Sequence, residues 1–142
     1  PTVAVMARDP DTGRWGNAGR NPDWNPIPGV LVVGSEGPLF YANAVSVKDR
    51  IHALVRRTEP RLVVLELSEN VQLDVGTLDM LDELVRELER AGVELRFAAV
   101  RRPAQELMRR SGLADRVRIE LTIDAAAGEL AGVPAVGGEA ER

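Results

Sequence analysis

The pattern of hydrophobic and polar residues between Leu62 and Gly92 predicts a strand, a loop and a helix. Residues 62–67 form a short apolar run, which is typical of a buried strand. After a polar turn, Asp74 stands where a helix N-cap is expected, and Gly92 stands where the helix should end. Between them, apolar residues recur every three or four positions and predict one buried helix face: Val75, Leu78, Leu81, Leu84, Val85 and Leu88.

A second apolar run, Val93–Val100, begins directly after this helix and predicts another strand. A strand, a helix and a strand joined by short connections form a βαβ unit. We therefore expect the two strands to be parallel and the crossover to be right-handed.

The remaining elements follow from similar patterns. We expect strands over residues 2–7, 30–33 and 117–121, and helices over residues 43–58, 103–112 and 125–130. Asn43 and Asp124 are the expected N-caps of the first and last of these helices. Leu39–Tyr41 is predicted to be a short extended segment after a Gly-Pro turn, and strands joined only by a turn can pair antiparallel. The fold class is therefore α/β, with helices packed on a mixed sheet of about four to five strands.

The segment from residue 9 to residue 29 predicts no regular element, because it is rich in Pro, Gly, Asn and Asp. A loop of this length is unusual in a compact domain. It contains both tryptophans, Trp15 and Trp24. We favour the interpretation that they pin the loop onto the core; the alternative makes them candidate residues of a partner interface.

Length and composition indicate the number of domains and exclude some classes of function. The 142 residues suffice for one domain, expected over residues 1–130, with a flexible tail over 131–142. No cysteine and a single histidine exclude thiol chemistry and a multi-histidine metal site within one chain, and a net charge of −4 argues against nucleic-acid binding. No run approaches the roughly 18 apolar residues of a membrane span. The chain starts at Pro1, as expected for a trimmed protein or for a domain of a longer one.

Two predicted loops are the best candidates for a binding site. Parallel strands place the loops that follow them at one edge of the sheet, where ligands gather in open α/β folds. Here these loops are Ser68–Asp74 and Arg101–Pro103, and both lead into helix N-termini, which favour anions. Arg101 and Arg102 could bind a phosphate or could be solvated surface charges. Glu69 and Asp74 oppose an anion, and no glycine-rich phosphate-binding motif is present.

The sequence offers no catalytic constellation, and we predict that the protein is not an enzyme. His52 is expected to be a solvated histidine on a helix face, and Asp74 with Thr77 is better explained by helix capping. The arginine pairs 56–57 and 109–110 are expected on solvated helix faces; beneath a membrane they could also contact anionic head groups.

Two motifs resemble those of a known family, the STAS domain. They are Gly37–Ala44, with the sequence GPLFYANA, and Val71–Leu81, which follows the strand over residues 62–67. The first motif is typical of the C-terminal cytoplasmic STAS domain of bacterial SulP (sulfate permease) anion transporters. The resemblance covers roughly residues 1–130. It implies a non-catalytic regulatory or interaction domain at the cytoplasmic face of the inner membrane. The implied partners are the transporter's own transmembrane domain, protein regulators or a second copy of the chain.

The resemblance also implies two more specific properties. STAS domains have been associated with guanine nucleotides, so GTP or GDP is a possible ligand, and the candidate site comprises Ser68, Asp74, Val75, Gly76, Thr77, Leu78, Arg101 and Arg102. The alternative branch of the family contains free-standing anti-sigma factor antagonists, which are switched by phosphorylation of a Ser or Thr directly after the loop aspartate. Val75 stands at that position and has no hydroxyl, which leaves Thr77 as a weak candidate acceptor.

Overall fold

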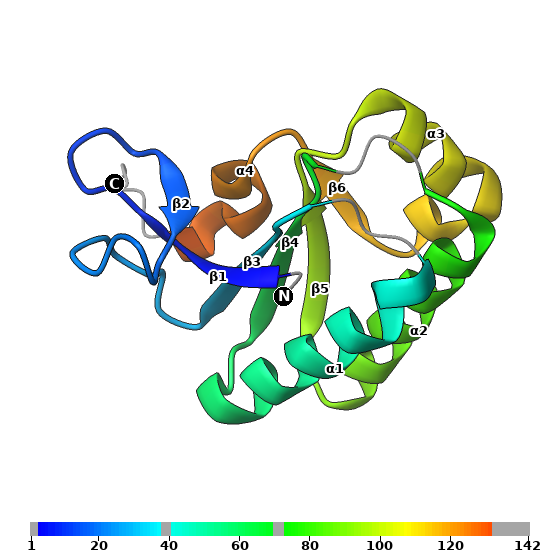
Figure 1. Ribbon diagram of the computed structural model, residues 1–142, viewed down its shortest axis with the longest axis horizontal. Coiled ribbons are helices and arrows are strands. Elements are labelled where there is room, and N and C mark those ends of the chain that lie inside the picture. Colours follow the sequence, from blue (N-terminus) through cyan, green and yellow to red (C-terminus); the bar gives the residue numbers. More distant parts are fainter. Residues whose placement is uncertain (1–2, 38–40, 70–72, 132–142) are drawn as a thin grey trace.

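The computed structural model describes residues 3–37, 41–69 and 73–131, and it contains a six-stranded mixed sheet in the order β2-β1-β3-β4-β5-β6 (Figure 1). The strands are β1 (Val3–Arg8), β2 (Trp15–Asn17), β3 (Val30–Ser35), β4 (Leu62–Glu66), β5 (Glu94–Ala98) and β6 (Arg118–Glu120). The helices are α1 (Tyr41–Thr58), α2 (Val75–Arg90), α3 (Arg102–Ser111) and α4 (Ile123–Ala127), with short 3₁₀ turns at Leu113–Asp115 and Gly128–Ala131.

The central strands carry apolar side chains on both faces, because both faces of the sheet are covered. Strands β3 to β6 are parallel, with Val33, Leu65 and Phe97 in register across β3, β4 and β5. Strand β1 is antiparallel to β3 and to β2. The predicted α/β class and the mixed sheet are confirmed, whereas the expected four to five strands are six.

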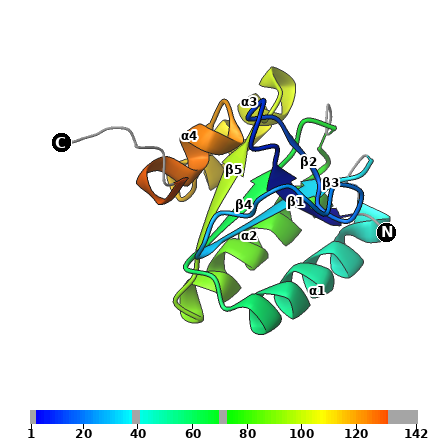
Figure 2. The same cartoon turned by 90° about the vertical axis from the view of Figure 1, so that its left-hand side faces the viewer.

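Two apolar cores lie on opposite faces of the sheet. The larger core joins the sheet to α1, α2 and α3, and its fully buried members include Ile51, Leu81 and Phe97. The smaller core joins the other face to α4 and to the segment between β2 and β3, through Ile27 and Ala126. Figure 2 shows α1 and α2 on one side of the sheet and α4 on the other.

The central unit forms as its sequence pattern predicts. Asp74 is the N-cap of α2, where its Oδ1 accepts a hydrogen bond from the backbone N–H of Thr77 at 2.7 Å. The apolar stripe of α2 is buried except at its first residue, and Gly92 adopts a left-handed φ of 79° directly after the helix. Strands β4 and β5 pair in parallel on either side of this helix, as a βαβ unit requires.

The expectation that residues 9–29 contain no regular element is wrong. Strand β1 continues to Arg8, and Trp15–Asn17 turns back to pair with it as β2. A strand of three residues that includes glycine is too short to show a recognisable pattern of apolar and polar residues. It forms because it pairs with β1, which the sequence pattern does not reveal. Trp24 then packs over this strand: a Cβ at Gly16 would lie 2.7 Å from Cζ3 of Trp24, so any other residue there would displace the indole.

Three predicted helix starts or extended segments also differ from the structure. Tyr41, predicted to be extended, is the first residue of α1, so Asn43 lies inside the helix and is not its N-cap. Thr122, not Asp124, caps α4, because its Oγ1 accepts from the N–H of Ala125 at 3.0 Å. Leu39 and residue 40, and the predicted tail beyond residue 131, lie outside the described residues.

Candidate functional site

The loops that follow β4 and β5 meet at the carboxyl edge of the sheet, as the parallel arrangement predicts. Their contact is specific: Nε of Arg101 donates to the backbone carbonyl of Ser68 at 2.7 Å. The guanidinium of Arg101 thereby links the loop that follows β5 to the loop that follows β4. We group Ser68, Arg101, Arg102 and the first turn of α2, residues 74–78, under the name strand-end rim, because the loops that lead to them leave the same edge of the sheet.

The first turn of α2 presents an apolar residue to solvent. Val75 is 74% exposed, although the other members of its stripe are buried. Gly76 beside it is half-buried, and Leu78 turns into the core. Asp74 and Val75 thus form an exposed start of α2, at the end of its buried stripe.

Thr77, the candidate phosphate acceptor, is fully buried. Its Oγ1 is a buried side-chain atom without a hydrogen-bond partner. A hydroxyl in this position is inaccessible to a kinase unless the first turn of α2 opens. Thr77 therefore contributes to the interior of the rim and not to its surface.

The turn between β5 and α3 is backbone-strained. Ala99 has a φ of 58°, which is the left-handed region that residues with a Cβ rarely adopt. Its N–H donates to the carbonyl of Glu120 at 3.0 Å, so the strained residue is held by the neighbouring strand. The turn places Arg101 at the N-cap position of α3 without a side-chain cap, and leaves Arg102 exposed.

A hollow of about 170 Å³ lies beside the rim, where β3 and β4 end. Its floor includes Met6 and Gly34, and three carboxylates line it: Glu36, Glu66 and Glu69. Such a lining repels phosphate, which leaves Arg101 and Arg102 as the positive charges of the rim. Glu36 and Glu66 were not predicted as site residues; their positions just after β3 and at the end of β4 are the signal that could have identified them.

The eight predicted site residues therefore form two groups. Ser68 and Arg101 are in direct contact, with Arg102 next to them, and Asp74–Leu78 form the first turn of α2. Residues 70–72, which connect the two groups along the chain, lie outside the described residues.

His52 is not the solvated histidine that the sequence suggested. Its Nε2 lies 2.6 Å from Oε1 of Glu87, and Nζ of Lys48 donates to Oε2 of the same carboxylate at 3.3 Å. The contacts with His52 and Lys48 hold the pKa of Glu87 below its ordinary range, and the contact with Glu83 raises the pKa of Lys48. This cluster fastens α1 to α2 near the end of α2, whereas the rim includes the first turn of that helix.

Candidate metal ligands do not gather in the described parts of the chain. These parts contain no cluster of three or more His, Asp or Glu residues that could hold a metal ion. No described helix is both long and apolar enough to cross a membrane. What the rim offers is shape, hydrogen-bond donors and an exposed apolar side chain.

Similarity to known proteins agrees with this fold. The family model of the STAS domain matches residues 21–126. A probable sulfate transporter of Mycobacterium tuberculosis is 32% identical over 93 residues, which are 64% of this chain and 17% of that protein. The chain spans about one sixth of the length of the curated relatives it matches first.

Two solved structures show the same fold. The murine anion transporter Solute Carrier 26 family member A9 superposes with a TM-score of 0.79 at 19% identity, over 89% of this chain and 21% of the transporter. An anti-sigma factor antagonist from Mycobacterium paratuberculosis superposes with a TM-score of 0.64 at 21% identity, over 91% of this chain and 94% of the antagonist. Because the family model matches most of the residues in the sheet and its helices, the chain belongs to the STAS domain family.

Proposed function

We propose that this chain is the cytoplasmic regulatory and interaction domain of a sulfate-type anion transporter, and that it binds partners without catalysing a reaction. Its partner is the transmembrane part of the same transporter chain, at the cytoplasmic face of the inner membrane. The similarity to a probable sulfate transporter, of which this chain matches 17%, supports the proposal.

The exposed Val75 is the observation that carries the binding role. It stands on a helix turn fixed by the cap of Asp74, next to loops that Arg101 ties together. A rigid turn that exposes an apolar residue gives up little conformational entropy on binding. The free energy gained by burying Val75 is therefore available for association.

Guanine nucleotide is a further candidate ligand of the same rim. The N–H groups at the start of α3 attract phosphate, and Arg102, the first residue of that helix, is exposed. The carboxylates of Glu66 and Glu69 oppose this attraction, and no specialised phosphate loop exists. Binding would therefore be weak and would modulate partner docking.

The antagonist-type phosphoswitch is the alternative function, and the likeness to a solved antagonist supports it at the level of the fold. Two features of the rim count against it. The residue after the cap aspartate is Val75, and the nearest hydroxyl, on Thr77, is buried. Incubation with ATP and an anti-sigma kinase separates the two functions, because stoichiometric phosphate on Thr77 would favour the switch.

The gene's complete reading frame tests the proposal. We expect a series of hydrophobic spans encoded ahead of Pro1, and we expect sulfate uptake by cells expressing the complete product to change when residues 1–142 are removed at equal membrane abundance. A start codon directly before Pro1 would overturn the proposal.

A further inference from the structure

We propose that strand β6 is a self-association edge, through which two copies of this chain pair antiparallel about a two-fold axis at Ile119. Strand β6 ends the sheet, and in the described part of the chain only β5 pairs with it. This inference does not depend on the transporter function proposed above. It rests on the backbone, the charges and the apolar residues of the edge, taken in turn.

The backbone of Ile119 faces the open side. The carbonyl of Glu120 accepts from the N–H of Ala99, so residue 120 directs its backbone groups toward β5 and the rest of the sheet. Successive residues of a strand direct these groups to opposite sides. The N–H and C=O of Ile119 therefore point outward, and a second copy centred on the same residue could exchange two hydrogen bonds with them.

The charges of β6 are self-complementary in that register. Arg118 and Glu120 project on the same face, and Nη2 of Arg118 donates to Oε2 of Glu120 at 3.1 Å. Pairing about Ile119 places Arg118 opposite Glu120 of the second copy, twice over. These positions are non-hydrogen-bonded pairs, in which opposite side chains approach most closely. Edge charges usually prevent pairing, but here their alternation suits it.

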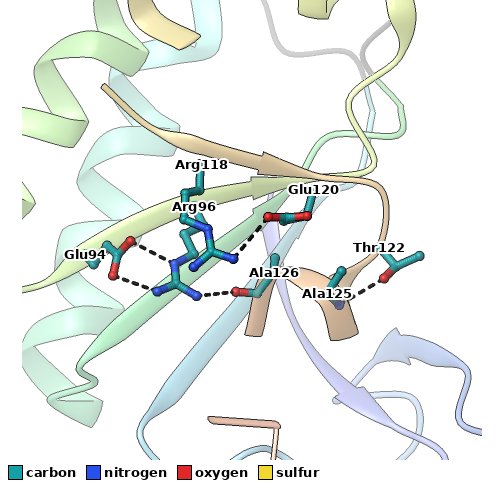
Figure 3. Close-up of polar contacts among 7 residues, drawn as sticks. All are labelled: Glu94, Arg96, Arg118, Glu120, Thr122, Ala125 and Ala126. Carbon is teal, nitrogen blue, oxygen red and sulfur yellow. Dashed lines mark hydrogen bonds and ion pairs between the residues drawn. The ribbon is translucent and has the colours of Figure 1, made fainter. Parts of the chain in front are cut away.

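The same face of the sheet already carries two neighbouring arginines, Arg96 and Arg118, each paired with a glutamate of its own strand (Figure 3). Arg96 on β5 binds Glu94 through Nε and Nη2, at 2.8 and 2.9 Å. Arg118 lies in register with Arg96, and Glu120 lies in register with Ala98. In the proposed dimer, Glu120 of the second copy would lie beside Arg118 and bring a negative charge next to the two arginines.

On the opposite face, the edge exposes an apolar residue. Leu121, one residue beyond β6, is 88% exposed. The register places it opposite Val117 of the second copy, on the side of the sheet that α3 covers. A hollow of about 250 Å³ on that side is lined in part by Ala114 and Ile119. Pairing would bring Leu121 against Val117 of the second copy and remove part of it from water.

Sedimentation of the 142-residue chain over about 10 μM to 1 mM tests the proposal, because an edge this short is expected to associate weakly. We expect a monomer–dimer equilibrium. Arg118→Glu and Glu120→Arg, each alone, place like charges opposite one another and should weaken the dimer at least tenfold. The double variant Arg118→Glu/Glu120→Arg restores complementarity and should restore association. Thermal unfolding of each variant verifies that it is folded.

A cysteine on the axis tests the register. The chain has no cysteine, and Cα atoms of a hydrogen-bonded antiparallel pair lie about 5.5 Å apart, within disulfide range. Ile119→Cys should therefore form a covalent dimer on oxidation, whereas Val45→Cys, at another exposed site, should not. A monomer throughout the concentration range, association that the single charge variants leave unchanged, a double variant that fails to associate, or equal cross-linking at both cysteines would overturn the proposal.

Discussion

Nη1 of Arg96 donates to the carbonyl oxygen of Ala126 at 2.8 Å and so joins β5 to α4. Arg96 is almost fully buried, and its guanidinium also donates to the carboxylate of Glu94. This contact lowers the pKa of Glu94. A helix of five residues is unstable in isolation. At its other end, Asp124 accepts from Arg8 and from the indole of Trp15. Polar contacts at both ends therefore hold α4 over the smaller core.

Replacing Arg96 tests this role. Arg96→Met removes a charged hydrogen bond to α4 and should lower the free energy of unfolding by about 2 kcal/mol. Amide exchange should accelerate in residues 125–127 more than in α2. Arg90→Met, at an exposed helix end, is the control and should change stability little. Equal exchange rates in α4 of both variants would show that Arg96 does not hold this helix.

The buried hydroxyl of Thr77 should cost stability. Thr77→Val replaces an unpartnered Oγ1 by a methyl group of similar size and should raise the free energy of unfolding by about 1 kcal/mol. Thr77→Ser keeps the hydroxyl, removes the methyl and should be destabilising. Urea denaturation of both variants measures the difference. A valine variant less stable than the wild type would mean that the hydroxyl has a partner.

The cluster between α1 and α2 predicts acid sensitivity. The contacts of Glu87 with His52 and Lys48 lower its pKa below the ordinary 4.5. The unfolded chain then takes up the proton at a higher pH than the folded one, so this stabilisation is full above about pH 4.5 and is lost as the pH falls through the lowered pKa. Glu87→Gln should flatten the loss of stability in acid, whereas the exposed-residue control Glu89→Gln should retain it. Identical acid profiles would contradict the role of the cluster.

A nucleotide titration tests the rim as a ligand site. Adding GTP should shift the amide NMR signals of Ser68, Gly76 and Arg101, while the insertion over residues 9–29 remains unchanged. Arg102→Glu should weaken the binding several-fold because it reverses a charge beside the phosphate site. Arg110→Glu, at the far end of α3, is the matched control. Shifts confined to residues 9–29 would refute this placement.

The features that sequence predicted best are those set by local periodicity and capping. The stripe of α2, the cap of Asp74 and the ends at Gly92 and Gly112 follow from the spacing of residues within one element. The meeting of two loops at the strand-end rim also followed, because parallel strands bring their carboxyl ends together. The contact of Arg101 with Ser68 is the structural consequence.

The features that sequence missed are set by contacts distant along the chain. Strand β2 exists because it pairs with β1 and because Trp24 covers Gly16. The environment of His52 depends on Glu87, a residue on another helix. Neither the strain at Ala99 nor the burial of Thr77 has a local sequence signal, since both arise from how the rim is packed.

Site-specific cross-linking in the complete gene product tests the central proposal, that Val75 docks on a membrane domain. A photoreactive benzoylphenylalanine at position 75 should yield cross-linked peptides from the hydrophobic spans of the same chain. The same group at position 90, at the exposed far end of α2, should yield few. Equal yields at the two positions, or no product from the spans at position 75, would contradict the account.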